Sequence, residues 1–456
     1  MRKAINHIIR EENFLSLAGN LVVAVFGFAV FAIIARSYAK EVFGEWVLFI
    51  SSAAFVEMFR FGITNTAIVR YLSGANSSER VQFIGSNSLI GLAATIVVAL
   101  LIAAANLIFG EPVHRAGYGL FFTWYPLLAF LNLPYNNALA LLQSERKYGK
   151  ILMIKIINSG GFFIVVLVNY LFLEMSIGEL LWALIALNAV SSAICSINSW
   201  DGMKYIRKAT VKTNRVLLNF GKYTTFTLIG TNLLRSADTL IISLSPLGTA
   251  AVALYSIPLK LTELQQIPLR SFAATAFPKM SRASILGKVD EVRKLFYTYA
   301  GAISILFVLV SLFTFIFADL FVLLLGGREY LGTDPVTGFN AVVIVRIFSV
   351  YGLLLPIDRM TGIGLDSINK PGINAIKVFY MLAANIVADV IAIFMFRSLE
   401  LVAVGSVLFT VLGILIGFYY LDKEINLKYS AIFNHGFGFY RSLAARVNKK
   451  KLQSAI

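Results

Sequence analysis

Long stretches without a charged residue dominate the chain. Seven of them come close to, or exceed, the ~20 residues that a helix needs to span the hydrocarbon core of a bilayer. A transmembrane β-barrel would show short alternating segments instead. The pattern therefore predicts an all-α polytopic membrane protein. The seven stretches are Phe14–Ala35, Val81–Gly110, Ala116–Ser144, Ile156–Leu173, Leu180–Trp200, Leu295–Ala318 and Leu401–Leu421.

Twelve membrane-spanning helices fit the pattern once segments with isolated charges are included. Most of the 40 Lys and Arg residues fall at the two ends of the chain and in every second connection. Because Lys and Arg collect in cytoplasmic loops, this alternation predicts an even number of spans with both termini cytoplasmic. The expected spans are 13–36, 43–66, 81–109, 117–143, 150–173, 177–200, 217–245, 250–278, 294–318, 335–365, 372–396 and 399–422.

The longest basic connection, 201–222, divides the chain into an N-terminal lobe (1–200) and a C-terminal lobe (223–422), each of six spans. A basic tail, 423–456, follows. The lobes share a weak internal repeat, because a shift of 222 residues aligns Pro134 with Pro356 and Lys155 with Lys377. An even number of spans separates the copies, which predicts a parallel repeat with a pseudo-two-fold axis along the membrane normal. Substrate sites in such proteins lie between the halves.

Composition agrees with a membrane protein and argues against several kinds of site and partner. Only 14% of the residues are charged, and the mean hydropathy is +0.78. The net charge of +16 collects in the connections, so it indicates topology and not a nucleic-acid partner. The single cysteine, Cys195, excludes an intramolecular disulfide, and the histidines lie at the ends or in a loop, so no His-based metal site is expected. Neither a phosphate-binding loop motif nor a long catalytic loop is present, which predicts a protein that is not an enzyme.

The basic tail allows two interpretations. Phe433, Phe437, Phe439 and Tyr440 stand among basic residues there, which is typical of an interfacial helix on an anionic leaflet. A solvated tail that only helps to fix the topology fits the same sequence.

Several ionisable residues fall inside expected spans, where a charge is costly and marks a functional candidate. Arg235 and Asp238 stand three positions apart on one helix face. Glu57/Arg60, Lys260/Glu263 and Asp358/Arg359 have the spacing of local ion pairs. Arg270 and Arg346 have no acidic residue within four positions. A surplus of guanidinium groups in a cavity suits a phosphate-bearing substrate. The candidate substrate-binding residues are Arg60, Arg235, Lys260, Arg270 and Arg346.

A carboxylate and an amide stand four residues apart in another expected span. Asp389 has no basic residue nearby in sequence, and Asn385 precedes it by one helical turn on the same face. The pair offers hard oxygen ligands for a small cation, or a titratable group for a proton. Pairing of Asp389 with an arginine on another helix is the alternative. Proline residues in several spans, Pro258, Pro268 and Pro278 among them, are typical of helices that bend.

Motifs along nearly the whole chain resemble those of the oligosaccharide flippases, which are polysaccharide biosynthesis proteins that include O-antigen repeat-unit flippases. This family belongs to the multidrug/oligosaccharidyl-lipid/polysaccharide exporter (MOP) superfamily. The motifs are NFLSLAGNLVVAVFGFAVFAIIARSYAKEVFGEW from Asn13, FRFGITNTAIVRYLS from Phe59, LLRSADTLIIS from Leu233, ALYSIPLKL from Ala253 and LLLGGREYLG from Leu323.

The resemblance implies two six-helix lobes around a V-shaped central cavity that opens alternately to the two faces of the bacterial inner membrane. It implies a polyprenyl-pyrophosphate-linked oligosaccharide as substrate, contact with membrane lipids, and the polysaccharide polymerase and chain-length machinery as partners. The lipid II flippase branch has a sodium site, and Asp238, Asn385, Asp389 and Thr410 match its residues. The chain departs from that branch after Leu421, where two further membrane helices would be needed and the sequence is polar and basic.

We therefore expect a flippase for undecaprenyl-pyrophosphate-linked repeat units. It would be driven by a Na⁺ or H⁺ gradient or by the membrane potential, and would need no other cofactor. A multidrug antiporter of the same superfamily is the first alternative, although its cavity should be acidic and not basic. A membrane glycosyltransferase or acyltransferase and a non-catalytic assembly scaffold are the others.

Overall fold

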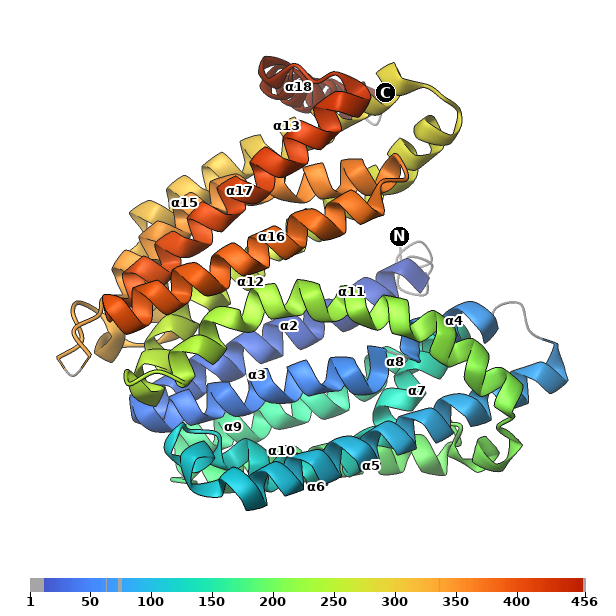
Figure 1. The fold of residues 1–456 in the computed structure, drawn as a ribbon, viewed down its shortest axis with the longest axis vertical. Coiled ribbons are helices and arrows are strands. Elements are labelled where there is room, and N and C mark those ends of the chain that lie inside the picture. Colours follow the sequence, from blue (N-terminus) through green and yellow to red (C-terminus); the bar gives the residue numbers. More distant parts are fainter. Residues whose placement is uncertain (1–11, 63, 73–75, 336, 454–456) are drawn as a thin grey trace. The chain divides into compact units, whose positions relative to one another are not determined.

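The computed structural model describes residues 12–62, 64–72, 76–335 and 337–453. These residues fold into helices and short connections (Figure 1). Within them, the strand-like pairing is limited to an isolated bridge between Thr333 and Asn340. The prediction of an all-α fold is confirmed.

Nine helices in the described residues are long and apolar enough to cross a membrane. Their ends lie within a few residues of the expected spans, because charged residues and turns mark both limits. They are α2 (Glu12–Ser37), α3 (Lys40–Gly62), α5 (Ser77–Arg115), α8–η1–α9 (Tyr148–Phe172), α10 (Ile177–Ile197), α13 (Val289–Ile316), α15 (Ala341–Ser367), α16–η4 (Pro371–Met395) and α17 (Leu399–Ile425).

The three remaining expected spans are also helical. One consists of α6 (Gly119–Leu131) followed by α7 (Leu133–Ser144), and the others are α11 (Val211–Ser243) and α12 (Gly248–Ile285). The break between α6 and α7 falls at Asn132, two residues before Pro134. Proline has no N–H for the helical ladder and clashes with the preceding turn, which explains the interruption. Pro356, its counterpart in the repeat, lies inside α15.

Five short or terminal elements had no counterpart in the expected spans. Each lies where the sequence is short, polar or mixed, so hydrophobic length gave no signal for it. They are α4 (Asn65–Leu72), the 3₁₀ helices η2 (Met203–Lys208) and η3 (Arg328–Tyr330), α14 (Ala318–Leu325) and α18 (Tyr429–Gln453).

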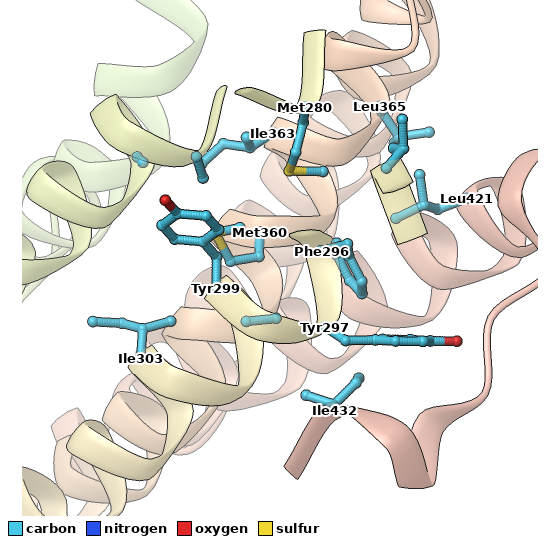
Figure 2. Close-up of a cluster of buried hydrophobic side chains, with 14 of the residues drawn as sticks. Met280, Phe296, Tyr297, Tyr299, Ile303, Met360, Ile363, Leu365, Leu421 and Ile432 are labelled. Carbon is cyan, nitrogen blue, oxygen red and sulfur yellow. The ribbon is translucent and has the colours of Figure 1, made fainter. Parts of the chain in front are cut away.

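The chain forms two compact units. The first contains residues 1–233 and 248–253, and the second contains 234–247 and 254–456. In the second unit, α12, α13, α15, α17 and α18 share one apolar core (Figure 2). Phe296 and Leu365 are fully buried there, and Met280 and Met360 pack beside them. Burial of this kind fixes the helices around the polar groups described below.

In the first unit, the basic connection packs on the membrane helix α5. A side chain at Gly85 of α5 would meet the carbonyl oxygen of Tyr205 in η2, so only glycine permits this approach. Ser86 and Thr213 share a hydrogen bond of 2.6 Å beside this contact. The connection that divides the chain is thus an ordered part of this unit.

An ion-pair cluster stands at the end of α7, outside the membrane spans. Glu145 lies 2.5 Å from Arg80 and 2.5 Å from Lys147. Burial raises the pKa of Glu145, but hydrogen bonds and charge from Lys147 and Arg80 outweigh that effect, so its pKa is lowered. The lowered pKa keeps Glu145 ionised at neutral pH, and its ion pairs join the start of α5 to the end of α7.

Candidate functional site

Asp238 and Asp389 are buried in the second unit, joined by one amide group. The Asn385 Nδ2 donates to Asp238 Oδ1 over 2.9 Å and to Asp389 Oδ2 over 3.1 Å. Asn385 and Asp389 are fully buried, and Asp238 is 4% exposed. Asp238 precedes Asn385 by 147 positions in the sequence, and only the family resemblance had connected it with Asn385 and Asp389. The structure brings these residues together.

Hydroxyl groups from two further helices complete the cluster. Tyr255 of α12 donates to Asp238 Oδ2 over 2.6 Å, and Ser406 of α17 donates to the same oxygen over 3.2 Å. Thr410, one turn after Ser406, is 1% exposed and donates to the Ser406 carbonyl. Sequence reasoning missed Tyr255 and Ser406. A buried tyrosine hydroxyl needs a partner, which was the available signal for Tyr255.

Local geometry explains how α16 and α17 present these groups. Residues four apart share a helix face, so Asn385 and Asp389 both point to α11 and α17. The π-helix η4 (Ile391–Met395) begins directly after this turn, and π-turns are frequent at functional sites. On α17, a Cβ at Gly405 would lie 3.0 Å from the Ala388 Cβ and 3.7 Å from Asp389 Oδ1. The missing side chain lets α17 approach the carboxylate closely.

The oxygen atoms of the cluster fit a small cation or a proton. The described groups that donate to the two carboxylates are uncharged, and two buried carboxylates at one site need a compensating charge. Asn385 Oδ1 and Asp389 Oδ1 are buried and have no hydrogen-bond partner in the described part of the chain. Carboxylate, amide and hydroxyl oxygens are ligands for hard cations such as Na⁺. No group of three or more His, Cys, Asp or Glu side chains suited to a transition metal occurs in the same part.

Gly405→Ala should separate α16 from α17. The new methyl group would press on Ala388, whose Cβ is fixed to a helix backbone and cannot rotate away. We expect the free energy of unfolding, measured by thermal unfolding in detergent, to fall by about 1–3 kcal/mol. Gly372→Ala in α16 is the control, because a Cβ there meets no atom within 4 Å. Equal stability of the two variants would show that the close approach is not required.

The first unit contains a second polar cluster, around Arg60 of α3. Arg60 is fully buried, and all three of its nitrogens donate to protein groups. It lies 2.6 Å from Glu57 Oε1, and Glu57 also accepts from Tyr125, Asn132 and Asn136. The predicted local pair is therefore present. Together these contacts occupy all three nitrogens of Arg60, so none is available to a ligand in this structure. The Glu57 side chain is 24% exposed and is the accessible member of the pair.

The adjacent pair expected between Asp358 and Arg359 is replaced by a pair between helices. Lys377 of α16 is 2% exposed and lies 2.6 Å from Asp358 Oδ1 of α15. Its Nζ also donates to the Asp358 carbonyl and to Thr361. A buried ammonium takes the partner that satisfies all three of its protons, and Arg359 is exposed. Lys377 therefore connects α15 to α16.

The other basic candidates are distributed over the second unit. Lys260 pairs with Glu263 over 2.8 Å, as its spacing predicts. Arg346 is half-exposed and pairs with Asp319 of α14 over 2.9 Å, which gives it a partner that the local sequence did not reveal. Arg270 is exposed on α12. Arg235 lies on α11, and the prediction for its side chain falls outside the described residues.

The described residues form two helical units, nine of whose helices are long and apolar enough to cross a membrane, and each unit buries polar groups. These features define a polytopic helical membrane protein. A family comparison places the chain within this class. The model of the polysaccharide biosynthesis protein family matches residues 9–284, which is more than half of the chain. The chain belongs to this family. No curated protein sequence matches it.

Solved transporters have the same fold. The lipid II flippase MurJ, in an inward closed conformation, is similar with a TM-score of 0.70 and 12% identity, over 94% of this chain and 92% of that one. An inward-facing MATE-family multidrug resistance transporter of the MOP superfamily gives 0.68 and 14%, over 90% of this chain and 100% of the other. A MOP superfamily transporter from Pyrococcus furiosus gives 0.58 and 15%, over 93% and 96%. The expected all-α fold with two helical lobes is confirmed.

Proposed function

We propose that this protein moves polyprenyl-pyrophosphate-linked oligosaccharides from the cytoplasmic to the periplasmic leaflet by alternating access. Membership of the polysaccharide biosynthesis protein family is the observation that carries the proposal. A fold shared with a lipid II flippase supports it. The transport moves the substrate without breaking a bond, so we propose no enzymatic step.

The buried carboxylate pair is the proposed coupling site. Asp238, Asn385 and Asp389 would hold Na⁺ or a proton, with Tyr255 and Ser406 orienting Asp238 and Thr410 beside them. Attraction between a cation and a carboxylate is stronger in the low-dielectric interior of a helix bundle than in water, and it favours binding of the cation at this site. Binding or release of the cation changes the charge between α11, α16 and α17, which couples the site to helix movement in the second unit.

Basic side chains are the proposed contacts for the pyrophosphate. Lys260, Arg270 and Arg346 are at least partly exposed and come from α12 and α15. Guanidinium groups suit bidentate binding of phosphate oxygens. Arg235 is proposed to share this role from α11. For Arg60 we propose an indirect role, in which it orients the half-buried Glu57 and the amides of Asn132 and Asn136 toward the substrate.

Removal of the protein from its bacterial host tests the proposed function. Lipid-linked repeat units should then accumulate in the cytoplasmic leaflet, because their synthesis continues while their export stops. Extraction of the lipids, with sugar analysis of each leaflet after impermeant labelling, measures this. An unchanged pool of lipid-linked sugar would contradict the proposal.

Export of organic cations is the second candidate function, because one of the similar solved structures named above is a multidrug resistance transporter. It predicts that the deletion strain becomes sensitive to cationic drugs and that its lipid-linked sugars stay normal. The basic character of the proposed substrate contacts favours the anionic substrate.

A further inference from the structure

The C-terminal helix α18 starts where a membrane span ends. Helix α17 stops at Ile425, and Asn426 takes a left-handed conformation (φ 53°) whose N–H donates to the Asp422 carbonyl. The chain turns there, and α18 begins at Tyr429. Three residues separate the two helices and reach at most about 10 Å. The start of α18 therefore lies close to the end of this expected span.

One face of α18 is packed against α13. Gly301 of α13 and Gly436 of α18 meet backbone to backbone, and a Cβ at either position would overlap the other helix. Ile432 lies beside Tyr297 in the shared core (Figure 2). The Tyr440 hydroxyl donates to the Ala302 carbonyl over 2.9 Å. These contacts hold α18 in place along its first three turns and contradict a freely solvated tail.

The exposed side of α18 is amphipathic. Phe437 is 63% exposed, and Phe433, one turn earlier, is 44% exposed. At 100° per residue, both lie next to the packed face on one side. Exposed Asn434, Gly438 and Ser442 lie on the remaining arc, and Arg441 stands between the two groups. An apolar edge followed by a basic residue and then a polar face is the pattern of a helix in the plane of a membrane interface.

Basic side chains surround this end of the second unit. Taken together, the exposed Lys and Arg residues at the end of α12, the start of α13, the α15–α16 turn and the segment from the end of α17 into α18 outnumber the exposed Asp and Glu residues there, which are Asp290, Glu291 and Glu424. Such a surface attracts an anionic leaflet. The exposed basic residues are Lys279, Arg282, Lys288, Lys294, Lys370, Lys423, Lys428 and Arg441.

We propose that α18 is an interfacial helix that binds an anionic phospholipid surface. Phe433 and Phe437 insert among the acyl chains, Arg441 contacts phosphate headgroups, and Asn434, Gly438 and Ser442 face water. The contacts with α13 would transmit this anchoring to the second unit. The proposal does not depend on which substrate the protein carries.

Site-specific fluorescence tests the orientation of α18. Cys195 is the only cysteine in the sequence and is buried, so a Cys195→Ala background permits single labels. Phe437→Cys and its neighbour Gly438→Cys would each carry an environment-sensitive dye in the full-length protein, reconstituted in phosphatidylcholine with phosphatidylglycerol. The dye at 437 should emit at shorter wavelength and be quenched by spin-labelled lipid. The dye at 438 should be quenched by aqueous iodide.

Two results would overturn the orientation. Equal iodide quenching at 437 and 438 would show a helix in water, and protection of 437 from both quenchers would show a covering protein. Two changes test the role of charge. Quenching of the dye at 437 by spin-labelled lipid should fall in the Arg441→Gln variant, and it should also fall in membranes of phosphatidylcholine without phosphatidylglycerol. Unchanged quenching under both conditions would exclude recognition of anionic lipid.

A matched pair of glycine variants tests the contact with α13. Gly436→Leu should release α18, because the side chain has no space against Gly301, so the dye at 437 should lose its lipid quenching. Gly438→Leu adds the same side chain to the same helix, where a Cβ meets no atom within 4 Å, and should leave the quenching unchanged. Thermal unfolding in detergent would verify that both variants fold. Equal quenching in the two variants would contradict the role of the glycine contact.

Discussion

Asp389→Asn is expected to reduce gradient-driven transport to the rate observed without a gradient. The substitution keeps the shape of the side chain but removes one of the two carboxylates that share Asn385. A neutral amide at that position gives the site less charge with which to bind Na⁺ or a proton. The measurement is transport by reconstituted protein with a Na⁺ gradient, with a pH gradient and with neither.

Asp366→Asn is the matched control for this prediction. Asp366 is also a carboxylate of the second unit, but it accepts from Asn374 and, among the described residues, has no hydrogen bond to the cluster. Its variant should keep the full response to the gradient. Retention of the response by Asp389→Asn as well would place coupling elsewhere in the protein.

Arg60→Met should destabilise the first unit by about 3–5 kcal/mol, because it leaves Glu57 as an uncompensated charge among buried amides. The double variant Glu57→Gln with Arg60→Met removes both charges and should recover most of this loss. Unfolding of each protein by heat or denaturant in detergent gives the comparison.

The same variants separate a structural role of Arg60 from direct binding of substrate. A positioning role predicts that stability and transport fall together in Arg60→Met and recover together in the double variant. Normal stability of Arg60→Met with weaker substrate affinity would indicate that Arg60 itself contacts the anionic substrate.

Hydrophobic length predicted the membrane helices well. Spans such as 81–109 and 399–422 lie inside α5 and α17 because charge-free runs have one stable conformation in a bilayer. Prolines within the spans were expected to bend their helices, and the helix is interrupted at Asn132, beside Pro134. The sequence did not reveal that Pro356 and the prolines of α12 would lie inside continuous helices. Helix α18 was one of two interpretations, because its mixture of Phe, Gly and basic residues fits both a helix and a solvated tail.

The site was predictable only where partners share a helix or a known pattern. Spacing revealed Glu57 with Arg60 and Asn385 with Asp389. Spacing could not reveal Arg346 with Asp319, or Lys377 with Asp358, because those contacts join different helices.

Asp238 shows why contacts between helices could not be predicted from spacing. Sequence left it between Arg235 and the residues of α16, and in the structure its oxygens accept from Asn385, Tyr255 and Ser406. Which helix a buried carboxylate faces depends on helix rotation, and rotation follows from packing at positions such as Gly405. No single stretch of sequence contains that information.

Transport of lipid-linked sugar by the purified protein tests the central claim most directly. Vesicles that contain an undecaprenyl-pyrophosphate-linked oligosaccharide would be prepared with and without the protein, and an impermeant sugar-oxidising reagent would count the molecules in the outer leaflet over time. We predict that the protein makes the inner-leaflet molecules accessible, and that an imposed Na⁺ or H⁺ gradient speeds this exchange. Equal exchange in vesicles with and without the protein would contradict the account.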